Sequence, residues 1–477
     1  MAELQHAPEA AREALRPDTL IIGFTGSPGS GCSFVADGIK NKLGSKAHHY
    51  MVSGELRRIA TNRGITNPTV ADLQNIGNEE RSEKGLSAVV ETCIERVKED
   101  AGVKRFGLDE DTVILIDGIK NEGEVRYLRF FANFWLISVQ AERETRENRS
   151  VGPEPDKKFK TTQEFDEADA RDQLEEPLYG QQVRKCNYLA DIILHNAEDF
   201  PPASEYQRDR YFDEIVKDYI NPMRTVRKGE RIPERPPSVR EALMTMAYCA
   251  SKRSSCLKRN VGAVIARVRE LKLKGEELRA RRTDAHVQFQ VISAGCNEVP
   301  PYSEACVFEF DKCYRDYLRE TKAAEYKNCP ACGEEIPQKI QCPRCGKDNA
   351  PTRGHCLACQ ADMLSYYECS RCGSKVFDEF MQGSGKFLDQ CRALHAEENA
   401  IIGMSTVNSA GEGDLFIYTT TFPCKLCANK IVQAGIKHVV YAEPYTQEDA
   451  KKVLDAADVD VQKFEGVKST AYFRLYS

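Results

Sequence analysis

The 477-residue chain contains no run of 18 apolar residues, and its first 20 residues lack the apolar core of a secretory signal. A membrane-spanning helix needs about 20 predominantly apolar residues, so neither a membrane span nor a signal peptide is expected. Positive charge is not in excess either, because the formal net charge is −6. A protein that coats nucleic acid would be basic overall. We therefore expect a cytoplasmic protein with no membrane partner.

Cysteine, by contrast, is abundant, with 19 residues. In a small secreted domain this content would indicate disulfides. Here the chain is long and more than half of its cysteines occur in Cys-x-x-Cys pairs. Metal ligation in a reducing compartment is the better interpretation. A chain of this length is also too long for one hydrophobic core, so two to four domains are expected.

The first conspicuous pattern follows a tail at residues 1–19. A buried-strand run, Leu-Ile-Ile-Gly-Phe-Thr, leads into a glycine-rich loop and then a helix. This order is typical of a P-loop, in which backbone N–H groups and the helix N-terminus bind phosphate. The candidate nucleotide-binding residues are Gly26, Gly29, Gly31 and Ser33.

The P-loop lysine is missing, because Cys32 occupies its position. That lysine normally reaches the β- and γ-phosphates, so its absence argues against kinase or ATPase activity. Nucleotide binding or sensing, with or without Mg²⁺, remains the expectation.

The strand Val113–Asp117 ends in an aspartate and resembles the Walker-B strand of nucleoside monophosphate kinases, which adds Asp117 to the candidate site. Residues 20–200 are thus predicted to be a P-loop kinase-like domain with a parallel sheet, and residues 201–236 a linker with one short helix near Phe212–Tyr219.

A second pattern lies near the C-terminus. It reads His395-Ala-Glu397, then, after a strand-like run, Pro423-Cys424-Lys-Leu-Cys427. One imidazole and two thiolates would give Zn²⁺ three ligands and leave a fourth position for water. Glu397 would then move protons between that water, the base and the departing ammonia. This is the signature of the zinc-dependent deaminases. A structural zinc knuckle or a redox Cys-x-x-Cys is the alternative, but neither needs Glu397.

Further segments resemble the deoxycytidylate deaminases in particular. They include Arg253-Ser-Ser-Cys-Leu-Lys-Arg259-Asn-Val-Gly and Gly-Cys-Asn297-Glu-Val-Pro. The resemblance implies that Asn297 contacts the deoxyribose and that Arg253 and Arg259 lie near the phosphate. A solvated loop is an equally good interpretation of the two arginines. Residues 237–477 are predicted to form a cytidine-deaminase-like α/β/α domain.

An insertion at residues 322–376 interrupts this domain. It carries a duplicated pattern, because adding 27 to the first four cysteine positions gives the last four. Each consecutive unit is predicted to be a small Cys₄ zinc ribbon whose metal supplies its folding energy. Redox pairs and an Fe–S site are the alternatives. The proposed structural ligands are Cys329, Cys332, Cys342 and Cys345 in the first unit, and Cys356, Cys359, Cys369 and Cys372 in the second.

The whole arrangement resembles the bacterial anti-phage deoxycytidine nucleotide deaminases. The resemblance implies one catalytic and two structural zinc ions, deamination of dCTP and/or dCMP, and regulation through the N-terminal domain by a nucleotide or a small RNA. We also expect a homo-oligomer. Three alternatives stay open: a housekeeping dCMP deaminase for thymidylate synthesis, a nucleic-acid cytosine or adenine deaminase, and a non-enzymatic scaffold.

Overall fold

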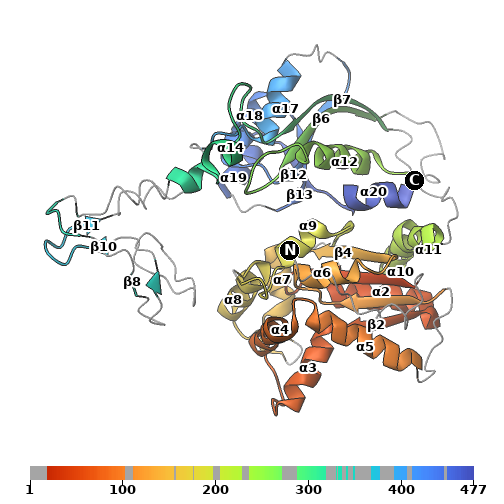
Figure 1. Ribbon diagram of the computed structural model, residues 1–477. Helices are drawn as coiled ribbons and strands as arrows, with labels where there is room; N and C mark the ends of the chain where they lie inside the picture. The colour runs from red at the N-terminus through yellow and green to blue at the C-terminus, as the bar shows by residue number, and fades with distance from the viewer. Residues whose placement is uncertain are drawn as a thin grey trace.

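The computed structural model describes residues 19–102, 111–154, 157–175, 177–196, 205–227, 236–270, 287–318, 329, 331–335, 340–341, 348–349, 367–376, 391–405, 411–444 and 448–476. These residues fold into two α/β domains, one below the other in Figure 1. Among them, no helix has both the length and the apolar character needed to cross a membrane.

The first domain is built on a six-stranded sheet with the strand order β15-β5-β4-β1-β3-β2. Neighbouring strands are parallel except for β15 and β5. Every residue of β1 and β3 is buried, as in parallel sheets with helices on both faces. The strands are β1 (Leu20–Thr25), β2 (Ala47–Met51), β3 (Val113–Asp117), β4 (Phe134–Gln140), β5 (Ile192–His195) and β15 (Gly466–Val467).

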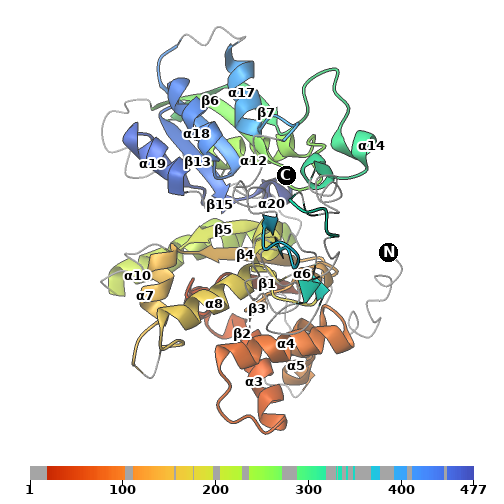
Figure 2. The same cartoon turned by 90° about the vertical axis from the view of Figure 1, so that its left-hand side faces the viewer.

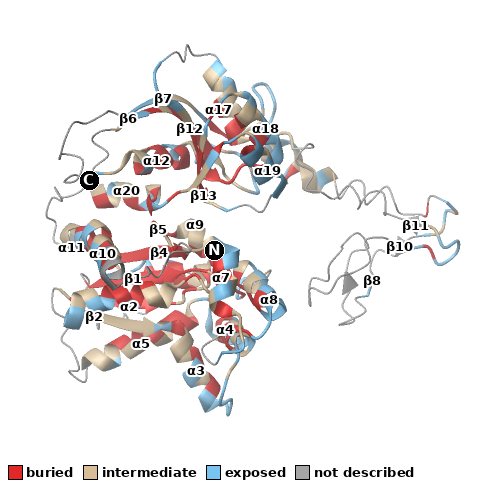
Figure 3. Cartoon of the chain, turned by 180° about the vertical axis from the view of Figure 1, so that it is seen from behind, coloured by how far each residue is buried: buried red, intermediate tan, exposed pale blue. Residues whose placement is uncertain are grey.

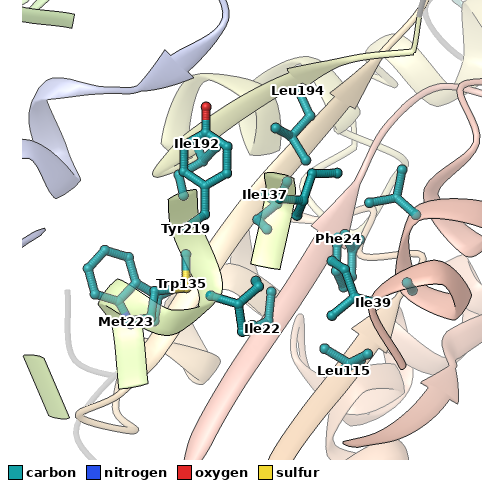
Figure 4. Close-up of a cluster of buried hydrophobic side chains, with 14 of the residues drawn as sticks. Ile22, Phe24, Ile39, Leu115, Trp135, Ile137, Ile192, Leu194, Tyr219 and Met223 are labelled. Atoms are coloured by element: carbon teal, nitrogen blue, oxygen red, sulfur yellow. The ribbon is translucent and has the colours of Figure 1, made fainter. Parts of the chain in front are cut away.

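Helices pack on both faces of this sheet. One face is covered mainly by α3 (Val52–Asn62), α4 (Val70–Lys84), α5 (Ala88–Gly102) and α6 (Glu122–Leu128), and the other by α2 (Cys32–Leu43) and helices from later in the chain. Figure 4 shows part of the second core, where Trp135 and Ile137 of β4 lie near Ile22 of β1 and Met223. The remaining helices of this domain are α7 (Arg143–Ser150), α8 (Thr162–Gln173) and α9 (Val183–Leu189).

The expected linker contains more structure than one short helix. Residues 205–227 form α10 (Glu205–Ile215), a π-helical turn (Val216–Ile220) and α11 (Asn221–Arg227). Phe212, Ile220 and Met223 from this segment are buried in the core of the first domain. Its apolar side chains face the sheet, so the segment is part of that domain.

The second domain has a mixed five-stranded sheet with the order β14-β13-β12-β6-β7. The pairs β6–β7 and β6–β12 are antiparallel, and the other pairs are parallel. The strands are β6 (Gly262–Glu270), β7 (Val287–Cys296), β12 (Asp414–Thr421), β13 (His438–Glu443) and β14 (Asp460–Lys463).

Helices also cover both faces of the second sheet. On one face lies α12 (Val239–Ser251), and on the other lie α17 (Ala396–Ser405), α18 (Lys425–Gln433) and α19 (Glu448–Ala456) (Figure 2). A capping box begins α12, because Ser238 and Glu241 each accept a hydrogen bond from the other's backbone N–H. Buried residues gather along both sheets and on the helix faces that pack against them (Figure 3).

The C-terminal residues of the chain return to the first domain. Strand β15 pairs with β5, with Val467 opposite Ile192, and α20 (Ser469–Tyr476) follows it. The guanidinium carbon of Arg474 lies 3.8 Å from the centre of the Trp135 ring. The expected deaminase segment at residues 237–477 therefore ends in residues that complete the P-loop sheet.

The insertion contributes only short strand pairs to the described structure. These pairs lie apart from both sheets, at the left of Figure 1. They are β8 (Ile340–Gln341) with β9 (Asp348–Asn349), and β10 (Tyr367–Glu368) with β11 (Lys375–Val376), and both are antiparallel.

Candidate functional site

Three metal-ligating side chains meet where two helices of the second domain begin. His395 directly precedes α17, Cys424 is the N-cap residue of α18, and Cys427 lies in the first turn of α18. The Sγ atoms of Cys424 and Cys427 each lie 3.3 Å from Nδ1 of His395. The helix N-terminus places its partial positive charge beside the two sulfur atoms and so favours their thiolate forms.

The donor set fits zinc. Tetrahedral bonds of about 2.3 Å to sulfur and about 2.0 Å to nitrogen would place these ligand atoms about 3.5 Å apart, close to the separations observed. A hydrogen bond from Cys427, and a further one from His395, lower the pKa of Cys424 to about 4 against the effect of burial. A thiolate is therefore available to a metal. Three protein ligands are the number found in catalytic zinc sites, whereas structural sites have four.

Glu397 lies in the first turn of α17, and its side chain is buried. Burial raises the pKa of this carboxyl group. Oγ1 of Thr419 donates a hydrogen bond to Oε1 of Glu397 over 3.3 Å, and it also donates to the carbonyl oxygen of Thr421. A buried carboxyl group with a raised pKa beside the ligands suits proton transfer.

A cavity of about 230 Å³ adjoins these residues, and its lining includes His395, Glu397, Cys424 and Asn297. The Asn297 side chain accepts a hydrogen bond from the backbone N–H of Val261 over 2.7 Å. It also donates one to the carbonyl oxygen of Arg259 over 2.8 Å. Asn297 therefore holds the loop that carries Arg259, besides lining the cavity.

The two predicted phosphate contacts lie in different places. Arg259 lines the cavity. Arg253 is not among the lining residues, its side chain is 79% exposed, and it pairs with Glu298 over 3.3 Å. The solvated-loop interpretation therefore fits Arg253 and not Arg259.

Sequence reasoning missed four residues of the site. Thr419 lies in the middle of β12, where no motif marks it. Lys258 directly precedes Arg259 in the segment that resembles the deoxycytidylate deaminases. Of the four missed residues, it is the one that the sequence could have indicated. Arg184 and Arg315 also line the cavity. Arg184 lies on α9 of the other domain, so only the tertiary structure could place it here.

The glycine-rich loop has the geometry expected of a P-loop. Gly29 and Gly31 have φ angles of +79° and +94°, in the left-handed region that favours glycine, and Gly31 caps α2. The loop stays close to its neighbours, because a Cβ atom on Gly26 would lie 2.5 Å from the carbonyl oxygen of Val139. Ser33 donates a hydrogen bond of 2.5 Å to Asp117. The structure therefore places Asp117, at the end of β3, beside the loop that carries the other four candidate residues. Those four are Gly26, Gly29, Gly31 and Ser33.

A lysine does lie at the P-loop, although Cys32 occupies the usual position. Nζ of Lys120 donates to the carbonyl oxygen of Gly26 over 2.8 Å and to Asp172 over 2.6 Å. Burial, followed by the charge of Asp117, raises the pKa of Cys32 to about 12. The thiol is therefore neutral, and Lys120 supplies a cation from the loop after β3.

The insertion brings together a different set of cysteines from the one expected. Cys329 lies 3.6 Å from Cys372, and Cys332 lies 3.6 Å from Cys369, measured between sulfur atoms. Sulfur ligands on one tetrahedral zinc would be about 3.8 Å apart. The first Cys-x-x-Cys pair of the insertion therefore lies against the fourth pair. The prediction that each consecutive half of the insertion forms its own Cys₄ site was wrong for these four residues. The inner cysteines, Cys342, Cys345, Cys356 and Cys359, lie outside the described residues.

Comparison with known proteins agrees with the geometry of both domains. A family model described as "Cytidine and deoxycytidylate deaminase zinc-binding region" matches residues 237–443. The deoxycytidylate deaminase of Schizosaccharomyces pombe is 27% identical over 231 residues, which cover 48% of this chain and 44% of that protein. The UPF0200 protein of Methanothrix thermoacetophila is 34% identical over 120 residues, which cover 25% of this chain and 58% of that protein.

Among solved structures, the dCMP deaminase from the cyanophage S-TIM5 in complex with dCMP and dUMP is 19% identical, with a TM-score of 0.24; the match covers 48% of this chain and 98% of that one. The chain spans only 44% and 58% of the two curated relatives named above. Residues 237–443 are therefore similar to the cytidine and deoxycytidylate deaminases, and the P-loop domain is similar to the UPF0200 proteins.

Proposed function

We propose that this protein hydrolyses deoxycytidine nucleotides, dCMP and/or dCTP, to the corresponding deoxyuridine nucleotides and ammonia in a zinc-dependent reaction. The observation that carries the proposal is the meeting of His395, Cys424 and Cys427 beside a cavity that His395, Cys424 and the buried Glu397 line. The similarity of residues 237–443 to the cytidine and deoxycytidylate deaminase family, together with the similarity of the chain to a curated deoxycytidylate deaminase, supports the choice of substrate.

The chemistry follows from the residue positions. Zinc held by His395 and the two cysteines would lower the pKa of a water molecule to near neutrality. Glu397 would take one proton from that water and deliver it to the ring nitrogen N3, and would then carry the second proton of the water to the departing amine. The C4–N bond breaks and a C4–O bond forms, so cytosine and water become uracil and ammonia. Thr419 holds the Glu397 carboxyl group in place for both transfers.

The N-terminal domain is proposed to bind a nucleotide at its P-loop and to regulate the deaminase. The left-handed glycines, the Ser33–Asp117 pair and Lys120 support an anion site there. In this proposal the protein depletes deoxycytidine nucleotides during phage infection. A cytoplasmic location, a homo-oligomeric state and a small RNA ligand are parts of the same hypothesis.

The first experiment measures product from purified protein given deoxycytidine, dCMP, dCTP and a cytosine-bearing oligonucleotide in parallel. Turnover of dCMP or dCTP that is absent from the Glu397→Ala variant is the expected result, and it would also fix the phosphate number. Turnover of the oligonucleotide alone would replace the proposal with nucleic-acid deamination.

A second experiment addresses the biological role. Deoxynucleotide pools are measured after phage infection of cells that express the wild type or Glu397→Ala. We expect a fall in dCTP and dCMP with the wild type only. Equal pools in both cultures would contradict the defence role and leave the enzymatic proposal intact.

A further inference from the structure

Two cavities of this protein share one wall of basic side chains. The catalytic cavity and a larger one of about 750 Å³ beside the P-loop are both lined by Arg184, Lys258 and Arg315. The larger cavity also contacts Ser27 and Ser30 of the P-loop. The same three cations therefore face the deaminase ligands on one side and the P-loop on the other.

The shared wall is assembled from both domains. Arg184 lies in the first turn of α9, in the P-loop domain, and is exposed. Lys258 precedes β6, and Arg315 follows α14 (Cys306–Phe310), both in the deaminase domain. Lys258 pairs over 2.5 Å with Asp316, which also lines the P-loop cavity. Neither domain alone would present all three cations.

Further charged groups lie at this junction. Arg184, Arg259 and Glu443 line a third cavity. Burial raises the pKa of Glu443, and the charge of Lys468, followed by those of Arg259 and Arg184, lowers it. Arg143 and Arg146 also line the P-loop cavity, together with the acidic Glu142 and Asp169. Arg146 is fixed by Asp169 over 2.5 Å and by the carbonyl oxygen of Pro28 over 3.2 Å.

We propose that Arg184, Lys258 and Arg315 form one phosphate site that both cavities use, an inference that rests on the proposed function. The phosphates of a deoxycytidine nucleotide bind these cations from the catalytic side, and those of a nucleotide at the P-loop bind them from the other side. Two anions that share the same cations repel each other and divide the same hydrogen-bond donors. Occupation of the P-loop cavity therefore weakens substrate binding, and the effect is reciprocal.

Equilibrium binding to the full-length, zinc-loaded Glu397→Ala protein tests the proposal without turnover. The ligands are dCMP and deoxycytidine, each with and without saturating ATP or tripolyphosphate as probes of the P-loop cavity. We expect either probe to raise the Kd of dCMP by at least about fivefold, the lower end of typical coupling between sites. The Kd of deoxycytidine, which has no phosphate, should not change.

Arg184→Gln in the same background is the decisive variant. Loss of one charge-assisted contact should raise the Kd of dCMP about tenfold to hundredfold without affecting deoxycytidine, and should reduce the effect of the probes. Arg210→Gln is the matched control, because Arg210 is an exposed arginine of the same domain that pairs with Glu214 and lines neither cavity.

Several results would overturn the shared site. These are an unchanged Kd of dCMP in Arg184→Gln, an equal loss for dCMP and deoxycytidine, or no effect of either probe on the wild-type site. Wild-type turnover is measured separately, so a protein that binds as expected but does not deaminate would refute the proposed function alone.

Discussion

At the scale of single residues, Asn297 has two roles. Its side-chain amide is hydrogen-bonded at both ends to the backbone of residues 259–261, while the residue lines the cavity beside His395 and Glu397. Loss of a deoxyribose contact affects deoxycytidine and dCMP alike, whereas release of the loop that carries Arg259 affects dCMP more, because only dCMP has a phosphate. The two roles can therefore be separated by experiment.

We expect Asn297→Ala to lower the free energy of unfolding by about 2 kcal/mol, about 1 kcal/mol for each hydrogen bond lost. It should also reduce kcat/KM more for dCMP than for deoxycytidine, because the loop that carries the proposed phosphate contact Arg259 is released. Chemical denaturation and steady-state kinetics measure the two effects. Asn399→Ala is the control, since Asn399 donates one hydrogen bond to the Cys296 carbonyl and does not line the cavity. An equal loss for deoxycytidine and dCMP would contradict the loop role.

Lys468 is a buried cation at the junction of the two domains. Its Nζ donates to the carbonyl oxygens of Asn187 and Tyr188 over 3.1 and 2.8 Å, and it lies 4.9 Å from the centre of the Tyr248 ring. Burial lowers its pKa to about 8, with Glu443 and Asp191 opposing the shift. The charged form is therefore less favourable in the folded protein than in the unfolded chain.

This pKa predicts a specific pH dependence of stability. Between the folded value of about 8 and the ordinary value of 10.5, the unfolded chain binds more protons, so the free energy of unfolding rises with pH. Relative to Lys468→Met, the wild type should gain up to ~3 kcal/mol across this interval, at 1.36 kcal/mol for each pKa unit. Denaturation of both proteins at several pH values measures the difference. A constant difference would show that Lys468 titrates normally.

At the scale of elements, the metal site of the insertion depends on which Cys-x-x-Cys turns lie together. The turn at Cys329–Cys332 and the turn at Cys369–Cys372 each offer two thiols, and neither pair alone can complete a tetrahedral site. They meet across 43 residues of sequence, from Cys329 to Cys372. A metal that joins such distant turns closes a long loop and offsets its conformational entropy.

Cys369→Ser should therefore remove one zinc ion per chain and leave the catalytic zinc in place, because β10 and β11 lie apart from the deaminase sheet (Figure 1). Metal analysis by mass spectrometry, combined with the deaminase assay, measures both parts. Cys249→Ser is the control, since Cys249 is free, exposed and outside the cysteine clusters. An unchanged zinc content in Cys369→Ser would rule out the outer cluster as a metal site.

At the scale of the whole molecule, the two domains are interlocked by the end of the chain. After the last strand of the deaminase sheet, β15 and α20 complete the sheet and core of the P-loop domain. The Arg474 guanidinium stacks on Trp135 and donates to the carbonyl oxygens of Phe134 and Ala132 over 2.8 and 3.0 Å. A substitution that weakens this contact should therefore destabilise both domains.

We expect Arg474→Ala to lower the midpoint of thermal unfolding by several degrees, because it removes about 2 kcal/mol of stacking and hydrogen bonding. Trp135 is the only tryptophan, so its fluorescence reports directly on this contact. In the wild type the fluorescence transition should coincide with the loss of deaminase activity. Arg210→Ala should behave as the wild type. Two separate transitions in the wild type would show that the domains unfold independently.

The sequence by itself determined the parts whose residues are neighbours in the chain. The His395–Glu397 and Cys424–Cys427 pairs each lie in one helical turn, and the glycines of the P-loop and the Ser238–Glu241 capping box are equally local. Fixed spacing along one element sets such geometry before any tertiary contact forms. The two α/β domains followed from the same local patterns, since buried strand runs and amphipathic helices are encoded over short distances.

Only the tertiary structure decided how distant segments combine. It placed Arg184 at the cavity of the other domain, Thr419 against Glu397, Cys329 beside Cys372, and the last residues of the chain on the first sheet. Each depends on packing between elements that are far apart in sequence, and an arginine on α9 or a threonine within β12 carries no local mark of its partner. Long-range contacts form only when the whole core is in place, and at this junction they join the P-loop domain to the cavity beside His395 and Glu397.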